Sequence, residues 1–181
     1  ESIAFDDGVI EQRAGVTVMT GFLDGFTGKI EVNGGALQLN SLSGAGVATV
    51  NSGGSLGGTG GVGGLVQVNA GGALTGAQGG DAFTMQTLRM QADASMNIAL
   101  IGALTPVPLF DVHGDVTLSG TLNITAPAEL PQGLYSIINY GGSLTDNGFA
   151  LGLVSAPLDP AAFMLFYGAP NKVGLIYGGH I

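Results

Sequence analysis

Val-Asn pairs recur at a fixed spacing in a glycine-rich part of this chain, and this repeat constrains the fold more than any other sequence feature. The pairs begin at residues 32, 50 and 68, and Gly-Gly-x-Leu elements begin at residues 34, 53 and 71. Residues 50–76 contain eleven glycines, but a random low-complexity tract would not keep Val, Asn and Leu in phase. The tract is therefore a structural repeat of about 18 residues rather than a flexible linker.

Between the glycines, apolar residues alternate with polar ones, as in Ile-Glu-Val at 30–32 and Val-Gln-Val at 66–68. The strongest alternating run covers residues 112–125. A period of two predicts strands with one buried and one solvated face. No stretch shows a sustained 3.6-residue stripe with caps, so we expect helix to be nearly absent.

Short strands separated by Asn-Gly and Gly-Gly corners at this period predict an all-β solenoid, in which each repeat is one coil and its strands stack in register on the next. Glycine and asparagine suit the corners because both tolerate positive φ, and a missing Cβ lets neighbouring coils approach to strand spacing. We expect Leu37, Leu56 and Leu74 to stack as an inward ladder.

The composition changes after about residue 104. All seven prolines and most of the larger aromatic residues lie beyond that point, and Gly-Gly-x-Leu elements become sparse. A solenoid must cover its last coil, because an open end exposes core and unpaired strand edges. We therefore divide the chain into coils (1–103) and a region of further coils with a cap (104–181). We expect a hairpin within residues 133–153, which contain Gly-Gly and Asp-Asn-Gly turns.

Charge and composition exclude several function classes. Thirteen acidic residues oppose four basic ones, for a formal net charge of −9, so binding to nucleic acid or anionic lipid has no electrostatic basis. The absence of cysteine excludes disulfides, thiol catalysis and cysteine-ligated zinc. No uninterrupted apolar run is long enough to span a membrane. The chain begins without Met, and we expect it to be a soluble piece of a longer precursor.

Two glycine motifs are weak candidates for binding sites. Residues 58–63 match GxGxxG, but a dinucleotide site needs a following helix and an acidic residue about 20 positions on, and neither is present. Residues 76–84 differ at one position from the calcium-binding nonapeptide of β-rolls. Such sites need tandem copies, and none precedes this one. We expect ordinary turns at both, and no cofactor.

Acidic and histidine residues do not form a convincing catalytic or metal set. Asp111, His113 and Asp115 alternate on a predicted strand, but residues two apart on a strand stand about 7 Å apart, too far to share an ion without help. A solvated outer face is the favoured interpretation. Asp6, Asp7 and Glu11 form the densest acidic group, in the weakly patterned N-terminal part. We assign no catalytic, metal or cofactor-binding residue, and we do not expect an enzyme.

Several segments resemble type V, pertactin-like autotransporter passengers. "SLGGTGGVGGLVQVNAGGALTG" (55–76) is similar to their glycine-rich repeats, and "FTGKIEVNGGALQL" (26–39) to the passenger-associated strand repeat. "FDVHGDVTLSGTLNITAP" (110–127) and "GLYSIINYGGSLTDNG" (133–148) resemble the C-terminal passenger region. The resemblance implies a right-handed, single-stranded parallel β-helix on a Gram-negative cell surface, exported through the periplasm and outer membrane. Its partners would be upstream passenger coils and a downstream outer-membrane barrel of the same precursor.

The resemblance also implies that residues 104–181 act as an autochaperone, which folds first and templates the other coils. The leading hypothesis is thus a structural and folding module. The alternative is an adhesin surface that binds host or sister molecules, and a third, disfavoured hypothesis is a polysaccharide-acting β-helix enzyme. The residues assigned to the core or the folding nucleus are Leu37, Leu56, Leu74, Phe110, Val112, Val116, Leu118, Leu122, Ile124, Tyr135, Ile137 and Tyr140.

Overall fold

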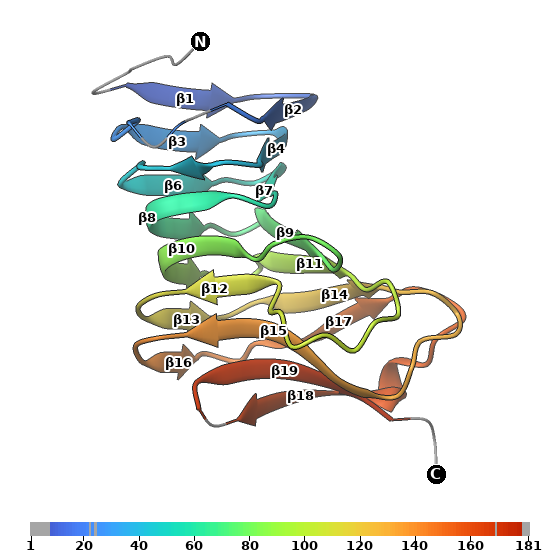
Figure 1. Ribbon diagram of the computed structural model, residues 1–181. Coiled ribbons are helices and arrows are strands. Elements are labelled where there is room, and N and C mark those ends of the chain that lie inside the picture. Colours follow the sequence, from blue (N-terminus) through green and yellow to red (C-terminus); the bar gives the residue numbers. More distant parts are fainter. Residues whose placement is uncertain (1–7, 22, 24, 169, 179–181) are drawn as a thin grey trace.

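A computed structural model describes residues 8–21, 23, 25–168 and 170–178 and shows a solenoid of stacked parallel strands (Figure 1). Strand β1 lies at one end of the stack and the β18–β19 pair at the other. The predicted scarcity of helix is confirmed, because the helical element of the described residues is one 3₁₀ turn, η1 (Pro160–Ala162). No helix in the described part of the chain is long and apolar enough to cross a membrane.

The first sheet has twelve strands among the described residues, and its path runs along the whole stack. Three short strands, β5 (Leu42–Ser43), β13 (Val116–Leu118) and β16 (Leu144–Asp146), pair beside this path. The strands of the path are β1 (Val9–Gln12), β3 (Lys29–Val32), β6 (Val47–Val50), β8 (Gly61–Val68), β10 (Phe83–Met90), β12 (Phe110–Val112), β15 (Gly133–Tyr140), β19 (Lys172–Tyr177) and β18 (Phe163–Gly168).

The second sheet has seven described strands, all paired in parallel. Each follows a strand of the first sheet across a corner, so a coil contributes to both sheets. The strands are β17 (Ala150–Val154), β14 (Thr121–Thr125), β11 (Ser95–Ala99), β9 (Ala73–Ala77), β7 (Gly54–Gly57), β4 (Gly35–Leu39) and β2 (Val16–Met19). The predicted parallel β-solenoid is confirmed, whereas its right-handedness stays a prediction.

The strand register gives the length of each coil directly. Val32, Val50 and Val68 are consecutive partners, which confirms the predicted 18-residue period for these coils. Nearer the C-terminus the period grows, and Phe110 pairs with Ile138, 28 positions on. The extra residues lie largely in two segments that leave the stack, 100–109 after β11 and 126–132 after β14 (Figure 1).

The interior of the coil is a series of apolar ladders. Leu37 pairs with Leu56 and Leu56 with Leu74, and all three side chains are at most 1 % exposed. The column continues through Met96 to Leu122, both fully buried. The predicted inward ladder is confirmed, and each rung buries apolar surface worth about 1.5–3 kcal/mol.

The corners behave as the glycine pattern predicts. Gly35, Gly53 and Gly71 all have positive φ, at 69°, 84° and 77°. The Gly35 amide donates to the Gly53 carbonyl at 3.1 Å, and the Gly53 amide to the Gly71 carbonyl at 3.0 Å. In the next coil Asp93 takes this place with φ of 62° and accepts from the Gly71 amide at 2.9 Å. The corners thus form their own hydrogen-bonded column along the stack.

Two expectations for the C-terminal region are wrong in detail. The alternating run at 112–125 is not one strand, because corners at 113–115 and 119–120 divide it between β12, β13 and β14. Residues 133–153 contain no hairpin: β15, β16 and β17 pair in parallel with β12, β13 and β14. The Gly-Gly and Asn-Gly turns in this segment are solenoid corners, which use the same residue types as hairpin turns.

The cap is a hairpin farther along the chain. Strands β18 and β19 pair antiparallel, and β19 pairs antiparallel with β15 of the last coil. Val173 and Leu175 are fully buried, and the rings of Phe163 and Tyr177 stack with centroids 4.7 Å apart. A C-terminal cap with hairpin strands is therefore confirmed. Both sheets continue across residues 103 and 104, and the division of the chain there stays a prediction.

Close backbone approach between coils gives a matched test. Alanine at Gly64 would place its Cβ against the carbonyl oxygen of Gly46 in the preceding coil, whereas a Cβ at Gly46 would meet nothing within 4 Å. We expect Gly64→Ala to lower the free energy of unfolding by about 1–3 kcal/mol through overpacking, and Gly46→Ala to change it by less than about 0.5 kcal/mol. Urea unfolding followed by circular dichroism measures both. Equal effects of the two variants would contradict the stacking distance.

Candidate functional site

The acidic and histidine residues singled out in the sequence do not converge. Asp111 lies on β12, His113 lies in the following corner, and the His113 Nε2 is 4.0 Å from the Asp111 carboxylate. Asp115 accepts hydrogen bonds from the Ser143 amide and hydroxyl at 2.8 and 2.9 Å, which lower the pKa of its carboxyl. The prediction that these three residues alternate on one strand is wrong, because a corner at 113–115 follows β12. Among the described residues there is no group of three metal-binding side chains.

The two glycine motifs are turns and strands. Residues 58–63 run from the end of β7 into β8, and a strand follows them where a dinucleotide site would need a helix. Residues 76–84 connect β9 to β10, and Asp81 is exposed in the turn. Asp6 and Asp7 lie outside the described residues. Glu11, the third member of that acidic group, lies on β1 and belongs to a different arrangement.

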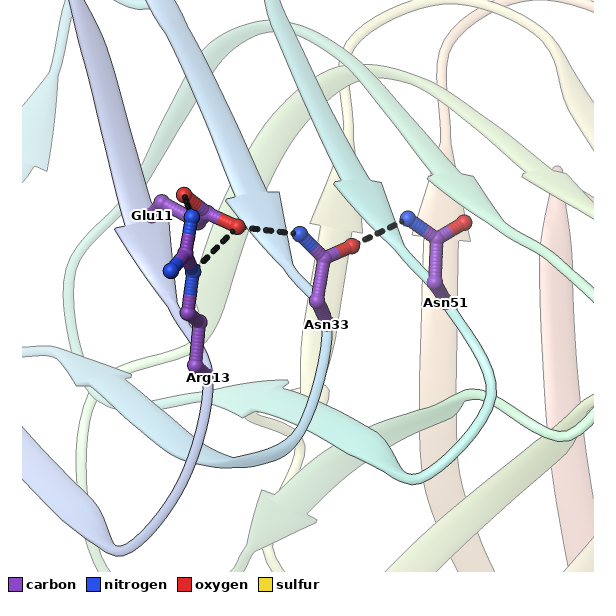
Figure 2. A network of polar contacts seen from close by, with 4 residues as sticks. All are labelled: Glu11, Arg13, Asn33 and Asn51. Atoms are coloured by element: carbon purple, nitrogen blue, oxygen red, sulfur yellow. Dashed lines mark hydrogen bonds and ion pairs between the residues drawn. The ribbon is translucent and has the colours of Figure 1, made fainter.

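A column of asparagine side chains, the asparagine ladder, connects successive coils after β3, β6 and β8 (Figure 2). The Asn51 Nδ2 donates to the Asn33 Oδ1 at 2.7 Å, and the Asn69 Nδ2 donates to the Asn51 Oδ1 at 2.7 Å. Gln67 joins the ladder through its Nε2, 3.2 Å from the Asn69 Oδ1. Every asparagine amide therefore points toward the N-terminal coil, which fixes the register of the corners.

The ladder ends on a carboxylate. The Asn33 Nδ2 donates to the Glu11 Oε1 at 2.9 Å, and Arg13 forms an ion pair with the same carboxylate at 2.8 Å (Figure 2). The hydrogen bond from Arg13, and then that from Asn33, hold the pKa of Glu11 below its ordinary value. A carboxylate accepts but has no N–H to pass on, so the chain of amides terminates here. The 18-residue spacing of the asparagines was visible in sequence, but their hydrogen bonds and this terminus were not inferred from it.

A groove with an uncharged lining of mixed polar and apolar residues lies along the second sheet, at the C-terminal ends of its strands. Its volume is about 500 Å³, and it crosses the coils from β4 to β14. None of the lining side chains is charged. The lining residues are Gln38, Asn40, Gly58, Thr59, Thr75, Gly76, Ala77, Gln78, Gly80, Asn97, Ile98, Ala99 and Thr125. This groove was not predicted from the sequence.

The residues assigned to the core or nucleus are placed as follows. Tyr140 is half-buried and packs against the core, and the others are at most 2 % exposed. The Tyr135 hydroxyl also donates to the Pro131 carbonyl at 2.6 Å. These positions show where the side chains lie, whereas their role in nucleation stays a prediction.

Comparison with known proteins gives one informative relative. The chain is 34 % identical over 159 residues to the adhesin BmaC autotransporter of Brucella suis biovar 1 (strain 1330). The match covers 81 % of this chain but only 5 % of the length of that protein. No family model matches the chain, and no solved structure does. Together with the β-solenoid, this relationship confirms the resemblance to an autotransporter passenger β-helix.

The asparagine ladder predicts a measurable loss of stability when its middle rung is removed. Asn51→Ala leaves the Asn33 Oδ1 and the Asn69 Nδ2 without their partner, and we expect a loss of about 1–2 kcal/mol in the free energy of unfolding. Asn147→Ala removes an exposed asparagine outside the ladder and is expected to cost less than about 0.5 kcal/mol. Urea midpoints compare the two. A similar small loss in both would mean that the ladder does not stabilise the fold.

The lowered pKa of Glu11 predicts a pH dependence. Because the pKa is lower in the folded chain than in the unfolded one, the carboxylate stabilises the fold above the ordinary value of 4.5, and this contribution is lost as the pH falls through the folded pKa. Glu11→Gln keeps an acceptor for Asn33 but does not titrate. We expect its unfolding midpoint to fall less than that of the original chain between about pH 6 and about pH 3. The exposed Glu129 supplies the control, and a Glu11→Gln slope equal to that of Glu129→Gln would contradict the assignment.

Proposed function

Because the chain is related to an autotransporter adhesin and folds as a β-solenoid, we propose that it is a stem segment of a passenger, in which the C-terminal coils nucleate folding and promote translocation and surface display. The observation that carries this proposal is the antiparallel β18–β19 hairpin, which packs on the last coil at the C-terminal end of the stack.

The closed end holds itself together. Strand β19 covers the edge of β15, and β18 in turn covers β19. Tyr167 on β18 hydrogen-bonds to Asp146 on β16, which ties the hairpin to the last coil. Phe163 is buried as part of the same core as Tyr135. The hairpin thus covers the edge of β15 and adds Phe163, Val173 and Leu175 to the buried core of the last coil.

The other end is open among the described residues. Strands β1 and β2 are the terminal strands of their sheets there. Val9, Val16 and Val18 are 58 %, 73 % and 54 % exposed, so this end offers apolar surface and strand edges. Coils added to it would continue both sheets. The hairpin at the C-terminal end supports growth from that end toward the N-terminal coils.

Four of the six buried aromatic side chains of the described residues lie beyond residue 104, whereas Phe26 and Phe83 lie in the earlier coils. Phe110 and Tyr135 are fully buried, and Phe149 is 5 % exposed. Large rings bury the most apolar area per residue. In a one-dimensional array, stability is the sum of coil and interface terms, so folding propagates from whichever end is stable by itself. Outside the outer membrane there is no ATP, and the free energy of this propagation would then drive export.

The same proposal places the chain on the surface of a Gram-negative cell as part of an exported passenger. Its partners would be the upstream coils and the outer-membrane domain of the same precursor. We propose a non-enzymatic role, in keeping with the name of the relative, an adhesin.

A second candidate function is adhesion by this segment itself, to host or sister molecules. Two observations favour it: the name of the relative, and the composition of the second sheet. The seven described strands of that sheet contain no charged residue, although the chain carries a net charge of −9. Two acidic surfaces approach each other with least repulsion across such an uncharged face.

Two deletions of equal length test the folding role. Removal of residues 155–181 takes away the hairpin, and removal of residues 1–27 takes away the first coil; each deletes 27 residues. We expect the first variant to lose cooperative thermal unfolding by circular dichroism, and the second to keep it. Residues 1–103 alone are also expected not to fold. A cooperative, β-rich melt of residues 1–103 would contradict nucleation by the C-terminal region.

Deletion of residues 104–181 from the precursor distinguishes the folding role from the adhesive one. Loss of surface display on removal of residues 104–181 supports the folding role. Normal display with lost attachment to host cells supports adhesion instead.

A further inference from the structure

The groove lies beside the point where backbone pairing between two strands of the second sheet ends. Strands β7 and β9 pair only at Ser55–Ala73 and Leu56–Leu74, whereas β9 and β11 pair at five positions. Beyond Leu56 the Thr75 hydroxyl donates to the Leu56 carbonyl at 3.2 Å, in place of a backbone ladder bond. No further pairing of β7 with β9 follows, and the groove is lined by residues 58–59 on one side and 75–78 on the other.

Glycine keeps the floor of this groove low. Gly58, directly after Gly57 at the end of β7, lines the groove and has a φ of 127°, and a Cβ there would collide with the Leu39 backbone. In the register of the sheet Gly57 lies between Gln38 and Thr75. The longer side chains of Gln38 on one side and Asn97 on the other form the walls. The depression is therefore built into the backbone and does not depend on a movable side chain.

The walls present hydrogen-bonding groups that the rest of the described chain does not use. The Asn97 Oδ1 accepts from the Asn123 Nδ2 at 2.8 Å, but the Asn97 Nδ2 has no partner among the described residues. The Gln38 amide and the Thr125 hydroxyl have none there either. Amide and hydroxyl groups both donate and accept, so the groove offers neutral, two-way hydrogen bonding.

This chemistry excludes most classes of ligand. Without a cation in its lining, the groove has nothing to hold a phosphate or sulfate group, and without a carboxylate it has no ligand of the kind that Ca²⁺ prefers. The exposed amides and hydroxyls disfavour a wholly apolar ligand, because that ligand would leave them buried without partners. A hydroxyl-rich, uncharged molecule matches the lining. The groove spans four strand spacings, about 19 Å, which suits an extended chain.

We infer that this groove binds a linear, neutral oligosaccharide along the axis of the solenoid. The inference rests on the second function proposed above and names the class of its ligand. No aromatic side chain lines the groove, so there is no ring for a sugar to stack on, and each site binds weakly, with a Kd on the order of 1 mM. Many passengers on one cell surface would convert weak sites into firm attachment through multivalency.

The test titrates the ¹⁵N-labelled 181-residue chain with maltohexaose and with chitohexaose, and follows backbone amide shifts by NMR. We expect saturable shifts confined to residues 58–59, 75–78 and 97–99. A heparin hexasaccharide, which is anionic, is expected to produce none there.

Three variants locate the site. Gln38→Ala combined with Thr125→Ala removes two unused hydrogen-bonding side chains and is expected to weaken binding about tenfold. Ala99→Trp fills the groove and is expected to abolish binding, with circular dichroism to confirm the fold. Gln91→Ala changes an exposed glutamine at a corner outside the groove and is expected to leave binding unchanged.

Several results would overturn the inference. One is the absence of amide shifts with both neutral oligosaccharides up to about 10 mM, and another is shifts that lie outside the groove. Equal binding by the original chain and by the Gln38→Ala/Thr125→Ala variant would also overturn it, as would shifts produced only by an extended peptide. Attachment of displaying cells to host cells is measured in parallel. If attachment persists in the Ala99→Trp variant and no oligosaccharide binds, the groove inference fails and the adhesive function stands. If oligosaccharide binds but displaying cells do not attach, the adhesive function alone fails.

Discussion

Every other feature of this chain depends on the in-register hydrogen bonding of each coil to the next. Parallel strands of both sheets bond only to strands of neighbouring coils, so no coil satisfies its own backbone. This requirement brings carbonyl groups against Cα atoms at positions such as Gly64, which explains the amount of glycine. The in-register pairing also places residues of the same type above one another, so that leucine stacks on leucine and asparagine on asparagine. The closed hairpin matters for the same reason, because a stack of this kind needs one end that can form without a neighbour.

The sequence predicts the features that repeat. Leu37, Leu56 and Leu74 share a position in each copy, and their burial follows from that position alone. The corners follow from the glycines. The hairpin was misplaced because Gly-Gly and Asn-Gly fit a hairpin turn as well as a solenoid corner. The strand that pairs with β15 decides whether a hairpin turn or a solenoid corner forms. Strand β15 pairs in parallel with β12, which precedes it in the chain, and antiparallel with β19, which follows it. The local residue pattern does not determine which partner strand is used.

The candidate site was harder to predict than the fold. The groove lies where pairing stops between β7 and β9, and no sequence motif marks that point. The nearby GxGxxG match contributes Gly58 to the lining, but for a reason unrelated to phosphate binding. The distribution of charge between the two sheets could not be predicted from the sequence either. Acidic residues are scattered along the sequence, yet the described strands of the second sheet are free of them, because strands of the first sheet and the corners take them instead.

The direction of the asparagine ladder has an electrostatic consequence. Each primary amide is a dipole with its positive end at the NH₂ group, and Asn33, Asn51 and Asn69 all point that end the same way. Aligned dipoles add, as they do for peptide groups in an α-helix, and they leave partial positive charge at one end of the column. Glu11 lies at that end (Figure 2). The rod thus carries a small axial polarity of side chains, and the two directions along it are electrostatically different even where the backbone looks the same.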